Sequence, residues 1–255
     1  MTIDYFEYPV LYGALTDIGR KRKTCQDEVI LAPEAGFFGV SDGMGGLSEG
    51  GASSVYVKKA MPLLLRSLAV QWKCRKPDAG SVAADLRNTV QMLSDRLFAQ
   101  GNTESYFRFG ATIAGVLLYG DRAVFVCLGD SRGYLLRRYR RLPQQITEDM
   151  NTAGLLVRAG EMSREEALNN PGSYRLYAFV GMAAPAAPEM FIEEVHPGDR
   201  ILLCSDGLYG MIPEREISRL MRSSKSPAAI CRRLIDTANK NGGRDNIAAV
   251  YIKIR

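Results

Sequence analysis

The stretch over residues 38–51, FGVSDGMGGLSEGG, combines an apolar segment with six glycines and one aspartate, Asp42. The apolar part is typical of a β-strand, and a strand that runs into Asp-Gly is typical of a turn. A plain turn rarely needs so much glycine, because glycine loses more conformational freedom on folding than any other residue. The stretch therefore indicates that another group must come close to the backbone here.

The chain around this stretch has the size and composition of a globular protein. Its 255 residues suit one large domain or two small ones, and 46% hydrophobic and 24% charged residues are ordinary values. The net charge of +5 is too mild to predict nucleic-acid binding. Two basic clusters, RKRK at residues 20–23 and RRYRR at residues 137–141, are most simply interpreted as solvated surfaces.

The cysteines and the N-terminus bear on the compartment. The number of cysteines is odd and no pair has the CxxC spacing, so neither a disulfide framework nor a zinc cluster is expected. The first ten residues lack the basic start and apolar stretch of a signal peptide. No segment approaches the roughly 18 apolar residues of a membrane span. We therefore expect a cytoplasmic protein without membrane attachment.

Short segments rich in β-branched and aromatic residues predict strands. These cover residues 10–16, 28–31, 36–41, 110–119, 123–128, 133–138, 190–195, 200–204 and 247–254. Long helices are predicted over residues 52–72, where Pro62 should kink or break the helix, and over residues 81–100. Residues 151–170 predict one or two short helices, and a last helix should begin after Ser226. Because the strands are grouped, the predicted fold class is α+β, with strand layers covered by helices.

Aspartates stand at the ends of five predicted strands, most of them beside glycine: Asp27, Asp42, Asp130, Asp206 and Asp245. Any one of them has an ordinary explanation, because aspartate and glycine are common in turns. Together they can gather at one edge of the sheets, where carboxylates about 4 Å apart repel strongly. Protons or cations must neutralise such a cluster, and oxygen ligands favour Mg²⁺, Mn²⁺ or Ca²⁺. The single histidine of the chain excludes a histidine-rich zinc or iron site.

The motifs in this order resemble the metal-dependent protein phosphatases of type 2C, the PPM family, and most of all its bacterial branch. The matching stretches span nearly the whole chain and read RKTCQDEV, SDGMGG, FGATIAGVLL, CLGDSRGYLL, TED, PGDRILLCSDGL and GGRDNIAAVYI. The resemblance implies a four-layer α-β-β-α sandwich, in which helices flank two mostly antiparallel sheets. It also implies a single catalytic domain over residues 1–255, with a flap near residues 147–171 that should influence substrate choice.

In this family, aspartates and one backbone carbonyl bind the metal ions, and the resemblance carries these roles to this chain. Asp42 would bridge two ions, and the carbonyl of Gly43 would bind one of them. Asp206 of the Ser-Asp-Gly motif and Asp245 of the Asp-Asn motif would be further ligands. Asp27 would be a ligand or would hold a metal-bound water. The two ions are expected to be Mn²⁺ or Mg²⁺.

The resemblance also implies how the substrate is bound and cleaved. Asp130 resembles the ligand of a third, weaker metal ion, and Arg22 would grip the substrate phosphate as a bidentate fork. Arg22 and Asp42 are thus the expected catalytic residues. Two ions about 3.5–4 Å apart can share a hydroxide that attacks the phosphorus of phosphoserine or phosphothreonine. The implied partners are phosphorylated proteins and a Ser/Thr kinase that the enzyme opposes, and a monomer is expected.

Four residues depart from the family pattern. Cys25 replaces the usual asparagine, and Gln26 replaces a frequent glutamate. Met44 stands where eukaryotic members have a histidine, so the general acid proposed there is absent and a metal-bound water becomes the expected proton donor. Met150 replaces another frequent histidine. We expect these changes to alter the rate and the pH profile more than the function.

Two alternative functions stay open at this point. Residues 129–133 match the G-x-S-x-G nucleophile elbow of α/β-hydrolases, with Ser131 as nucleophile, although the next segment is predicted to be a strand where an elbow needs a helix. The other alternative is a pseudophosphatase that binds phosphoproteins or serves as a scaffold. The presence of Asp42, Asp206 and Asp245 argues against it, because pseudoenzymes usually lack at least one such ligand.

Overall fold

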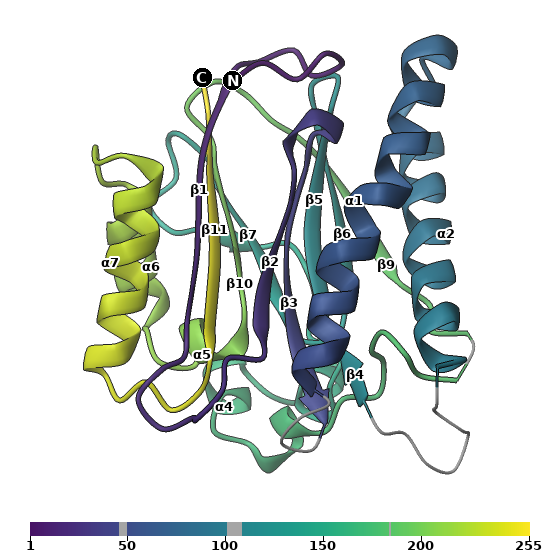
Figure 1. The fold of residues 1–255 in the computed structure, drawn as a ribbon. Coiled ribbons are helices and arrows are strands. Elements are labelled where there is room, and N and C mark those ends of the chain that lie inside the picture. The colour runs from purple at the N-terminus through teal and green to yellow at the C-terminus, as the bar shows by residue number, and fades with distance from the viewer. Residues whose placement is uncertain (46–49, 101–108, 184) are drawn as a thin grey trace.

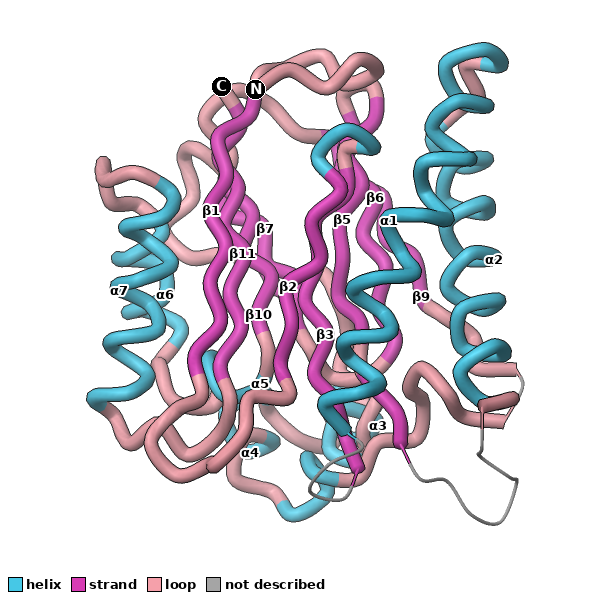
Figure 2. The backbone as a smooth tube through the Cα atoms, viewed as in Figure 1, coloured by secondary structure: helices cyan, strands magenta, loops and turns pink. Residues whose placement is uncertain are grey.

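The computed structural model describes residues 1–45, 50–100, 109–183 and 185–255, so the end of the glycine-rich stretch, residues 46–49, lies outside the described part. Two sheets lie face to face in the centre, with helices on both outer faces (Figure 1). Figure 2 shows the same layers by element type. The helices on these outer faces are α1 (Gly50–Arg75) and α2 (Ala79–Phe98) over one sheet, and α6 (Glu214–Met221) and α7 (Pro227–Lys240) over the other. The predicted α+β class and four-layer sandwich are therefore confirmed.

All pairs of strands that the structure describes are antiparallel. The first sheet has the order β1-β11-β10-β7-β8. Its strands are β1 (Val10–Asp17), β7 (Arg132–Leu136), β8 (Gln144–Gln145), β10 (Arg200–Cys204) and β11 (Ile247–Ile254). The second has the order β2-β3-β5-β6-β9, with β4 paired to β3. Its strands are β2 (Asp27–Ala32), β3 (Phe37–Gly45), β4 (Phe109–Ala111), β5 (Ile113–Tyr119), β6 (Arg122–Leu128) and β9 (Glu189–Glu194).

Apolar side chains between the two sheets form the central layer of the core. Phe38 and Val116 of the second sheet and Leu203 and Val250 of the first are fully buried there. Burying a side chain of this size contributes about 1.5–3 kcal/mol. Separate apolar clusters lie between each sheet and its helices, with Trp72 in the cluster under α1 and α2. Since apolar contacts occupy the faces of the sheets, polar residues are left to the ends of the strands.

The predicted helices after residues 150 and 226 are confirmed, and each of them begins after a residue whose side chain caps the backbone. Ser226 caps α7. The predicted short helices are α3 (Thr152–Arg158) and α4 (Arg164–Ala167), followed by the 3-10 turn η2 (Pro171–Tyr174). Asn151 caps α3, and Ser163 caps α4 in a capping box with Glu166. A side-chain oxygen that accepts from the first turn satisfies N–H groups that a helix cannot bond itself.

The structure differs from the prediction in two details. Of the two expectations for Pro62, the break is wrong: α1 continues to Arg75, because its packing against β2 and β3 outweighs the loss of one backbone hydrogen bond. The strand predicted over residues 110–119 is two strands, β4 and β5, separated at Thr112. The Thr112 N–H donates to the Asp42 carbonyl oxygen (2.8 Å), and its hydroxyl accepts from the Asp42 N–H (3.0 Å). The interruption of the strand thus supports a predicted site residue.

Candidate metal centre

The five predicted aspartates meet at one end of the sandwich, although they come from both sheets. Asp27 begins β2 and is the register partner of Asp42 in β3. Asp206 begins α5 (Asp206–Tyr209), two residues after the end of β10, and Asp245 lies two residues before the start of β11. The charges of Asp27, Asp206, Asp130 and Asp245 all act on the carboxyl group of Asp42. The structure therefore gathers the carboxylates that stand at separate strand ends in the sequence.

Two glycines allow the segments around Asp206 and Asp245 to come into contact. A Cβ atom on Gly207 would lie 1.9 Å from the carbonyl oxygen of Asn246. A Cβ atom on Gly19, whose φ is +81°, would lie 2.1 Å from the carbonyl oxygen of Asp245. Backbone atoms cannot move aside to relieve such contacts, so glycine is required at both positions. Gly207 thereby lets α5, and with it Asp206, approach the segment that carries Asp245.

Asn246 holds the loop between β1 and β2, which carries Arg22, against the same segment. Its side-chain N–H groups donate to the carbonyl oxygens of Ile18 and Thr24, both at 2.9 Å, and its Oδ1 accepts from the Gln26 N–H at 2.8 Å. The residue is buried. The sequence interpretation overlooked it, and its only signal was its place in the Asp-Asn motif.

The carboxyl groups of Asp27, Asp42 and Asp206 have raised pKa values. Burial, together with the charge of Asp206, raises the pKa of Asp27 to about 7, although a hydrogen bond from the Ser205 hydroxyl (2.5 Å) acts to lower it. Burial and the charge of Asp245 raise the pKa of Asp206 to about 6. Burial, followed by the charges of Asp27 and Asp206, raises the pKa of Asp42 well above its usual range. Such shifts are expected where several carboxyl groups share one site without a cation.

The donor set fits a hard divalent cation. Oδ1 of Asp27 and Oδ1 of Asp206 are buried, and neither has a hydrogen-bond partner in the described part of the chain. Buried oxygens of this kind are rare in native proteins, and carboxylate oxygens are the ligands that Mg²⁺ and Mn²⁺ prefer. Among the described residues, however, no group of three or more acidic, cysteine or histidine side chains is arranged closely enough to hold a metal ion. Asp245 is engaged instead by Arg22, whose Nη2 lies 2.6 Å from Asp245 Oδ2.

Three further predicted positions lie beside this centre. Gly43 continues β3 after Asp42, and its N–H donates to the carbonyl oxygen of Gln26 (3.1 Å). The Cys25 thiol lies 3.6 Å from the carbonyl oxygen of Asp27, at the start of β2. Met150 is buried, and its sulfur accepts a hydrogen bond from the N–H of Gly129 (3.5 Å). Met150 therefore supports the turn that carries the next aspartate of the site.

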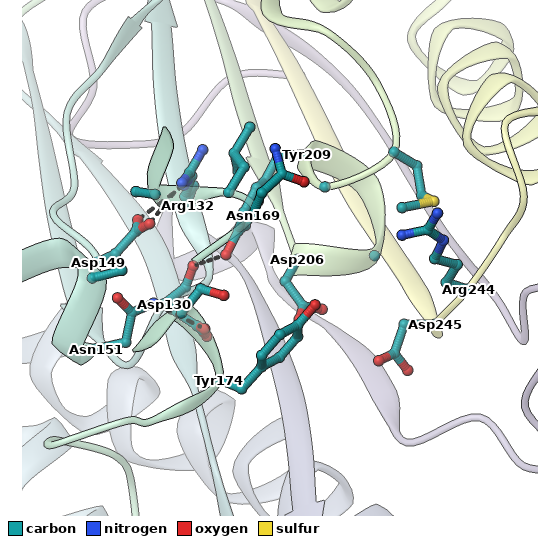
Figure 3. A pocket seen from close by; sticks show the side chains of 17 residues that line it. Asp130, Arg132, Asp149, Asn151, Asn169, Tyr174, Asp206, Tyr209, Arg244 and Asp245 are labelled. Carbon is teal, nitrogen blue, oxygen red and sulfur yellow. Dashed lines mark hydrogen bonds and ion pairs between the residues drawn. The ribbon is translucent and has the colours of Figure 1, made fainter. Parts of the chain in front are cut away.

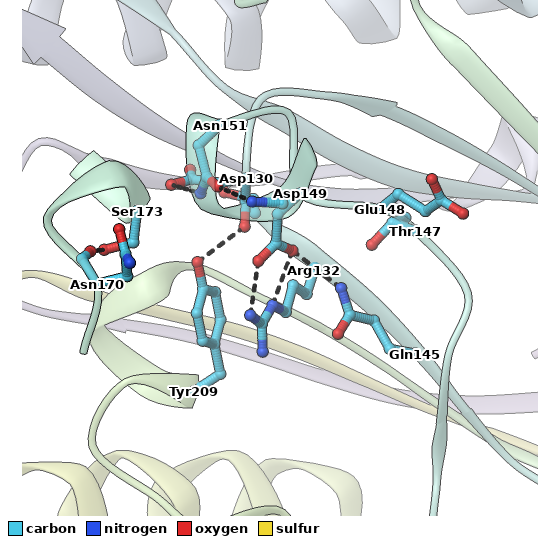
Figure 4. Close-up of polar contacts among 12 residues, drawn as sticks. Asp130, Arg132, Gln145, Thr147, Glu148, Asp149, Asn151, Asn170, Ser173 and Tyr209 are labelled. Atoms are coloured by element: carbon cyan, nitrogen blue, oxygen red, sulfur yellow. Dashed lines mark hydrogen bonds and ion pairs between the residues drawn. The ribbon is translucent and has the colours of Figure 1, made fainter. Parts of the chain in front are cut away.

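Asp130, the fifth aspartate, has a polar network of its own (Figure 4). Its carboxylate accepts a long hydrogen bond from Asn151 Nδ2 (3.5 Å), and its backbone carbonyl accepts one from the Tyr209 hydroxyl (3.0 Å). The guanidinium of Arg132 stacks on the Tyr209 ring and forms a two-pronged ion pair with Asp149, with distances of 2.9 and 2.6 Å. Since Asp149 and Asn151 belong to the predicted flap, the network joins the base of that segment to Asp130.

A pocket of about 280 Å³ lies between this end of the sheets and the predicted flap. Asp130, Asp206 and Asp245 line it, together with Tyr174 and Arg244 (Figure 3). The other two aspartates are not among its lining residues. Arg244 is exposed and forms no ion pair with any described residue, and the sequence interpretation overlooked it because an arginine beside a motif aspartate has no distinctive signal.

The G-x-S-x-G match is not a nucleophile elbow. Ser131 is followed directly by β7 and not by a helix. Its hydroxyl is buried and hydrogen-bonded to the hydroxyl of Thr112 (2.6 Å). An elbow presents its serine at a sharp turn from strand to helix, where the oxygen is accessible to substrate. The α/β-hydrolase alternative is therefore wrong.

The family model described as Protein phosphatase 2C matches residues 19–250 of this chain. The chain belongs to the protein phosphatase 2C family. Phosphatases of this type depend on metal ions, which agrees with the cluster of unpartnered carboxylate oxygens. Membership confirms the resemblance that the motif order predicted, and it identifies the protein as a hydrolase of the phosphatase class.

Relatives and solved structures agree with this assignment. The serine/threonine phosphatase stp of Listeria monocytogenes is 30% identical over 217 residues, which cover 84% of this chain and 82% of the relative. The serine/threonine phosphatase of S. agalactiae has a TM-score of 0.81 at 26% identity, covering 97% of this chain and all of that one. The catalytic domain of the phosphatase PstP in complex with two manganese ions has a TM-score of 0.72 at 27% identity, covering 96% and 98%. The chain is thus similar to bacterial members, as predicted.

All five cysteines are free. None of the helices in the described part of the chain has the length and apolar character needed to cross a membrane.

Proposed function

We propose that this protein removes phosphate from phosphoserine and phosphothreonine in proteins and that it needs divalent metal ions to do so. The observation that carries the proposal is the meeting of Asp27, Asp42, Asp206 and Asp245 at one end of the sandwich, with two buried oxygens left without partners. The names of the relatives support the substrate class, and the homologous structure with two manganese ions supports the metal.

The aspartates are the proposed metal ligands. Asp42 would bridge two Mn²⁺ or Mg²⁺ ions, with Asp27, Asp206, Asp245 and the carbonyl of Gly43 as the further ligands. The ions, when bound, lower the pKa of a water and neutralise phosphoryl oxygens. The central place of Asp42 supports the bridging role, since the charges of the other four aspartates all act on its carboxyl group. A third ion is proposed at Asp130.

Arg22 is the proposed phosphate-binding residue. Its side chain is 54% exposed and lies beside the centre, where it now pairs with Asp245. The planar guanidinium can hold two phosphoryl oxygens at once, which a lysine cannot do. Only Nη2 of Arg22 donates to Asp245, so the guanidinium keeps other N–H groups with which it can bind phosphate. The exposure of its side chain leaves room for that phosphate.

The predicted domain organisation and biological setting are part of the proposal. We propose one catalytic domain in which residues 147–171 form a flap over the pocket, so that Tyr174 and Arg244 face the polypeptide on either side of the phosphorylated residue. The free cysteines support a reducing, cytoplasmic compartment. A monomer that opposes a Ser/Thr kinase is the proposed form.

Hydrolysis of synthetic substrates tests the proposed function. With Mn²⁺ we expect phosphate release from a phosphothreonine peptide and from p-nitrophenyl phosphate, and with a chelator we expect release from neither. A matched unphosphorylated peptide gives the background. If folded, Mn²⁺-treated protein bound the phosphopeptide but turned over neither substrate, the pseudophosphatase alternative would replace the proposal.

A further inference from the structure

The loop between β7 and β8 carries the second basic cluster of the sequence and has no part in the proposed reaction. We use the name arginine tip for Arg138, Tyr139, Arg140 and Arg141. The strand β7 begins beside the metal centre and runs away from it, pairing with β10 in the opposite direction. At about 3.3 Å per residue, its five residues place the tip roughly 16 Å or more from the centre. The tip therefore lies toward the far end of the first sheet.

Helix α6 holds one side of the tip. Arg222, at the end of α6, donates through Nη1 to the carbonyl oxygen of Arg140 (2.6 Å). The Ser218 hydroxyl, within α6, donates to the carbonyl oxygen of Arg141. Both contacts bind backbone carbonyls, so they fix the course of the loop and leave the arginine side chains free to bind elsewhere.

The turn between β9 and β10 holds the other side. Asp199 is buried and accepts a hydrogen bond from the Arg138 N–H (2.8 Å). The neighbouring Arg137 is neutralised, since it pairs with Glu193 (2.7 Å) and with Asp199 (3.3 Å). The stem of Arg138 packs on Gly198, where an added Cβ would lie 2.7 Å from its Cδ. The loop is thus anchored at both ends before any partner binds.

The side chains of the tip are displayed to solvent without partners. Tyr139 is 86% exposed, and the Arg138 guanidinium lies over its ring at 5.2 Å. Within the part of the chain that the structure describes, Arg138, Arg140 and Arg141 form no ion pair. Three like charges on an anchored loop repel one another, and this repulsion is relieved when anions bind. A preordered loop also loses less entropy on binding than a flexible one.

We propose that the arginine tip is a docking site for acidic segments of the phosphoprotein substrates, and this proposal rests on the proposed function. A cleft of about 960 Å³ beside the tip gives such a segment a place to lie. Arginine matches carboxylates in a two-pronged geometry that lysine cannot offer, and all three cations of the tip are arginines. Tyr139 adds an exposed aromatic surface, which is a common anchor in protein interfaces.

The lining of the cleft favours a peptide over a membrane or a nucleic acid. Glu194, His196 and Asp199 line it together with Arg137, Arg138 and Arg140. A uniformly anionic surface would bring phosphates against the exposed carboxylate of Glu194 as well as against the tip. A short peptide can place carboxylates opposite the arginines and neutral residues opposite the acidic side chains. Mixed charge in the cleft therefore indicates a ligand whose charges are spaced along a chain.

Binding of an unphosphorylated peptide tests the docking site independently of catalysis. The probe is a fluorescein-labelled peptide of about twelve residues rich in Glu and Asp, measured by anisotropy at low salt. We expect the triple variant Arg138→Gln/Arg140→Gln/Arg141→Gln to bind about tenfold more weakly than the wild type, because exposed ion pairs are individually weak but act together here. The matched control, Arg75→Gln/Arg87→Gln/Arg96→Gln, removes three exposed arginines from α1 and α2 and should bind as the wild type does.

Steady-state kinetics test whether docking serves the reaction. Two phosphothreonine peptides carry either an acidic or a neutral tail, joined by a linker of about ten residues that can extend roughly 33 Å. For the acidic-tailed peptide, the triple variant should raise KM severalfold and leave kcat unchanged. For the neutral-tailed peptide and for p-nitrophenyl phosphate, it should change neither. If the wild type did not turn over p-nitrophenyl phosphate at all, the proposed function itself would be contradicted. The docking site could still be tested in that case, because peptide binding does not require catalysis.

Other results would overturn the docking proposal. Equal peptide binding by the triple variant and the wild type would show that the tip is not the site. An equal loss in the control variant would show that only net charge matters. Tip-dependent binding of vesicles with phosphatidylserine, or of single-stranded RNA, without binding of the acidic peptide would assign the tip to a membrane or to a nucleic acid instead.

Discussion

The two ends of strand β7 carry arginines in opposite surroundings. At the catalytic end, Arg132 is buried, pairs with Asp149 through two hydrogen bonds and stacks on Tyr209. Just beyond the far end, Arg138 is exposed; its backbone and stem are held, and its guanidinium lies over the exposed ring of Tyr139 without an ion-pair partner among the described residues. The same type of side chain is thus part of an internal network at Arg132 and is presented to solvent at Arg138.

This difference shows how the environment decides what an arginine does. A buried guanidinium needs a carboxylate partner, because an unpaired charge inside a protein is strongly destabilising. An exposed guanidinium needs none, because water and salt screen its charge. Arg132 can therefore position neighbouring groups such as Asp149, whereas Arg138 remains available to an outside partner. Stability measurements on Arg132 and Arg138 variants test this contrast directly, and three further predictions concern the catalytic end alone.

The largest expected effect comes from removing the buried cation. Arg132→Met leaves the largely enclosed Asp149 carboxylate without its ionic partner and with only the hydrogen bond from Gln145, so we expect the free energy of unfolding to fall by about 3–5 kcal/mol. Arg138→Gln, at the other end of the strand, should change it by less than about 0.5 kcal/mol. Urea unfolding followed by circular dichroism measures both. The double variant Arg132→Met/Asp149→Leu should regain part of the loss, and a single-variant loss below about 1 kcal/mol would contradict the contrast.

The next effect is on activity at the catalytic end. Asp206→Asn removes one proposed ligand charge, and we expect kcat/KM for a phosphopeptide to fall at least about 100-fold, since even outer-shell changes cost 10–100-fold. The fold should survive, because the amide has nearly the same shape. Asp236→Asn, on the exposed face of α7, is the matched control and should keep full activity. Near-normal activity of Asp206→Asn in Mn²⁺ would refute the ligand assignment.

A smaller effect is expected from Asn246, which holds the Arg22 loop. Asn246→Ala leaves three backbone groups without their partner, and we expect a loss of about 1–3 kcal/mol in the free energy of unfolding. KM for the phosphopeptide should rise more than kcat falls, since Arg22 acts through phosphate binding. Asn88→Ala, at an exposed position of α2, is the control. An unchanged KM would show that the loop does not depend on Asn246.

The smallest effect concerns pH and metal. The raised pKa values of Asp27, about 7, and of Asp206, about 6, mean that the folded protein binds these protons more tightly than the unfolded chain. Their contribution to stability is therefore full below about pH 4 and is lost as the pH rises to about 7. Mn²⁺ replaces those protons, so it should raise Tm more at pH 7.5 than at pH 5. Calorimetry with and without chelator measures the difference, and an equal gain at both pH values would contradict the expectation.

Local patterns were sufficient for the secondary structure and for the aspartates. Strand residues alternate or cluster by hydrophobicity, and caps such as Ser226 act within a few residues, so both leave a signal in a short window. The helix α6 was not predicted, because no side chain caps its start at Pro213. The division of one predicted strand at Thr112 was also missed, because it depends on hydrogen bonds to Asp42, which lies far away in the chain.

The sequence by itself determined which residues could take part in the metal centre, because oxygen ligands and an arginine fork are chemical properties of the side chains. Only the tertiary structure decided how they meet. Gly207 is required because the Asn246 carbonyl lies against it, and Arg22 pairs with Asp245 across more than two hundred residues. The tertiary structure also decided that Arg132 is enclosed and Arg138 exposed. Burial and distant contacts arise from packing, and packing depends on the whole chain at once.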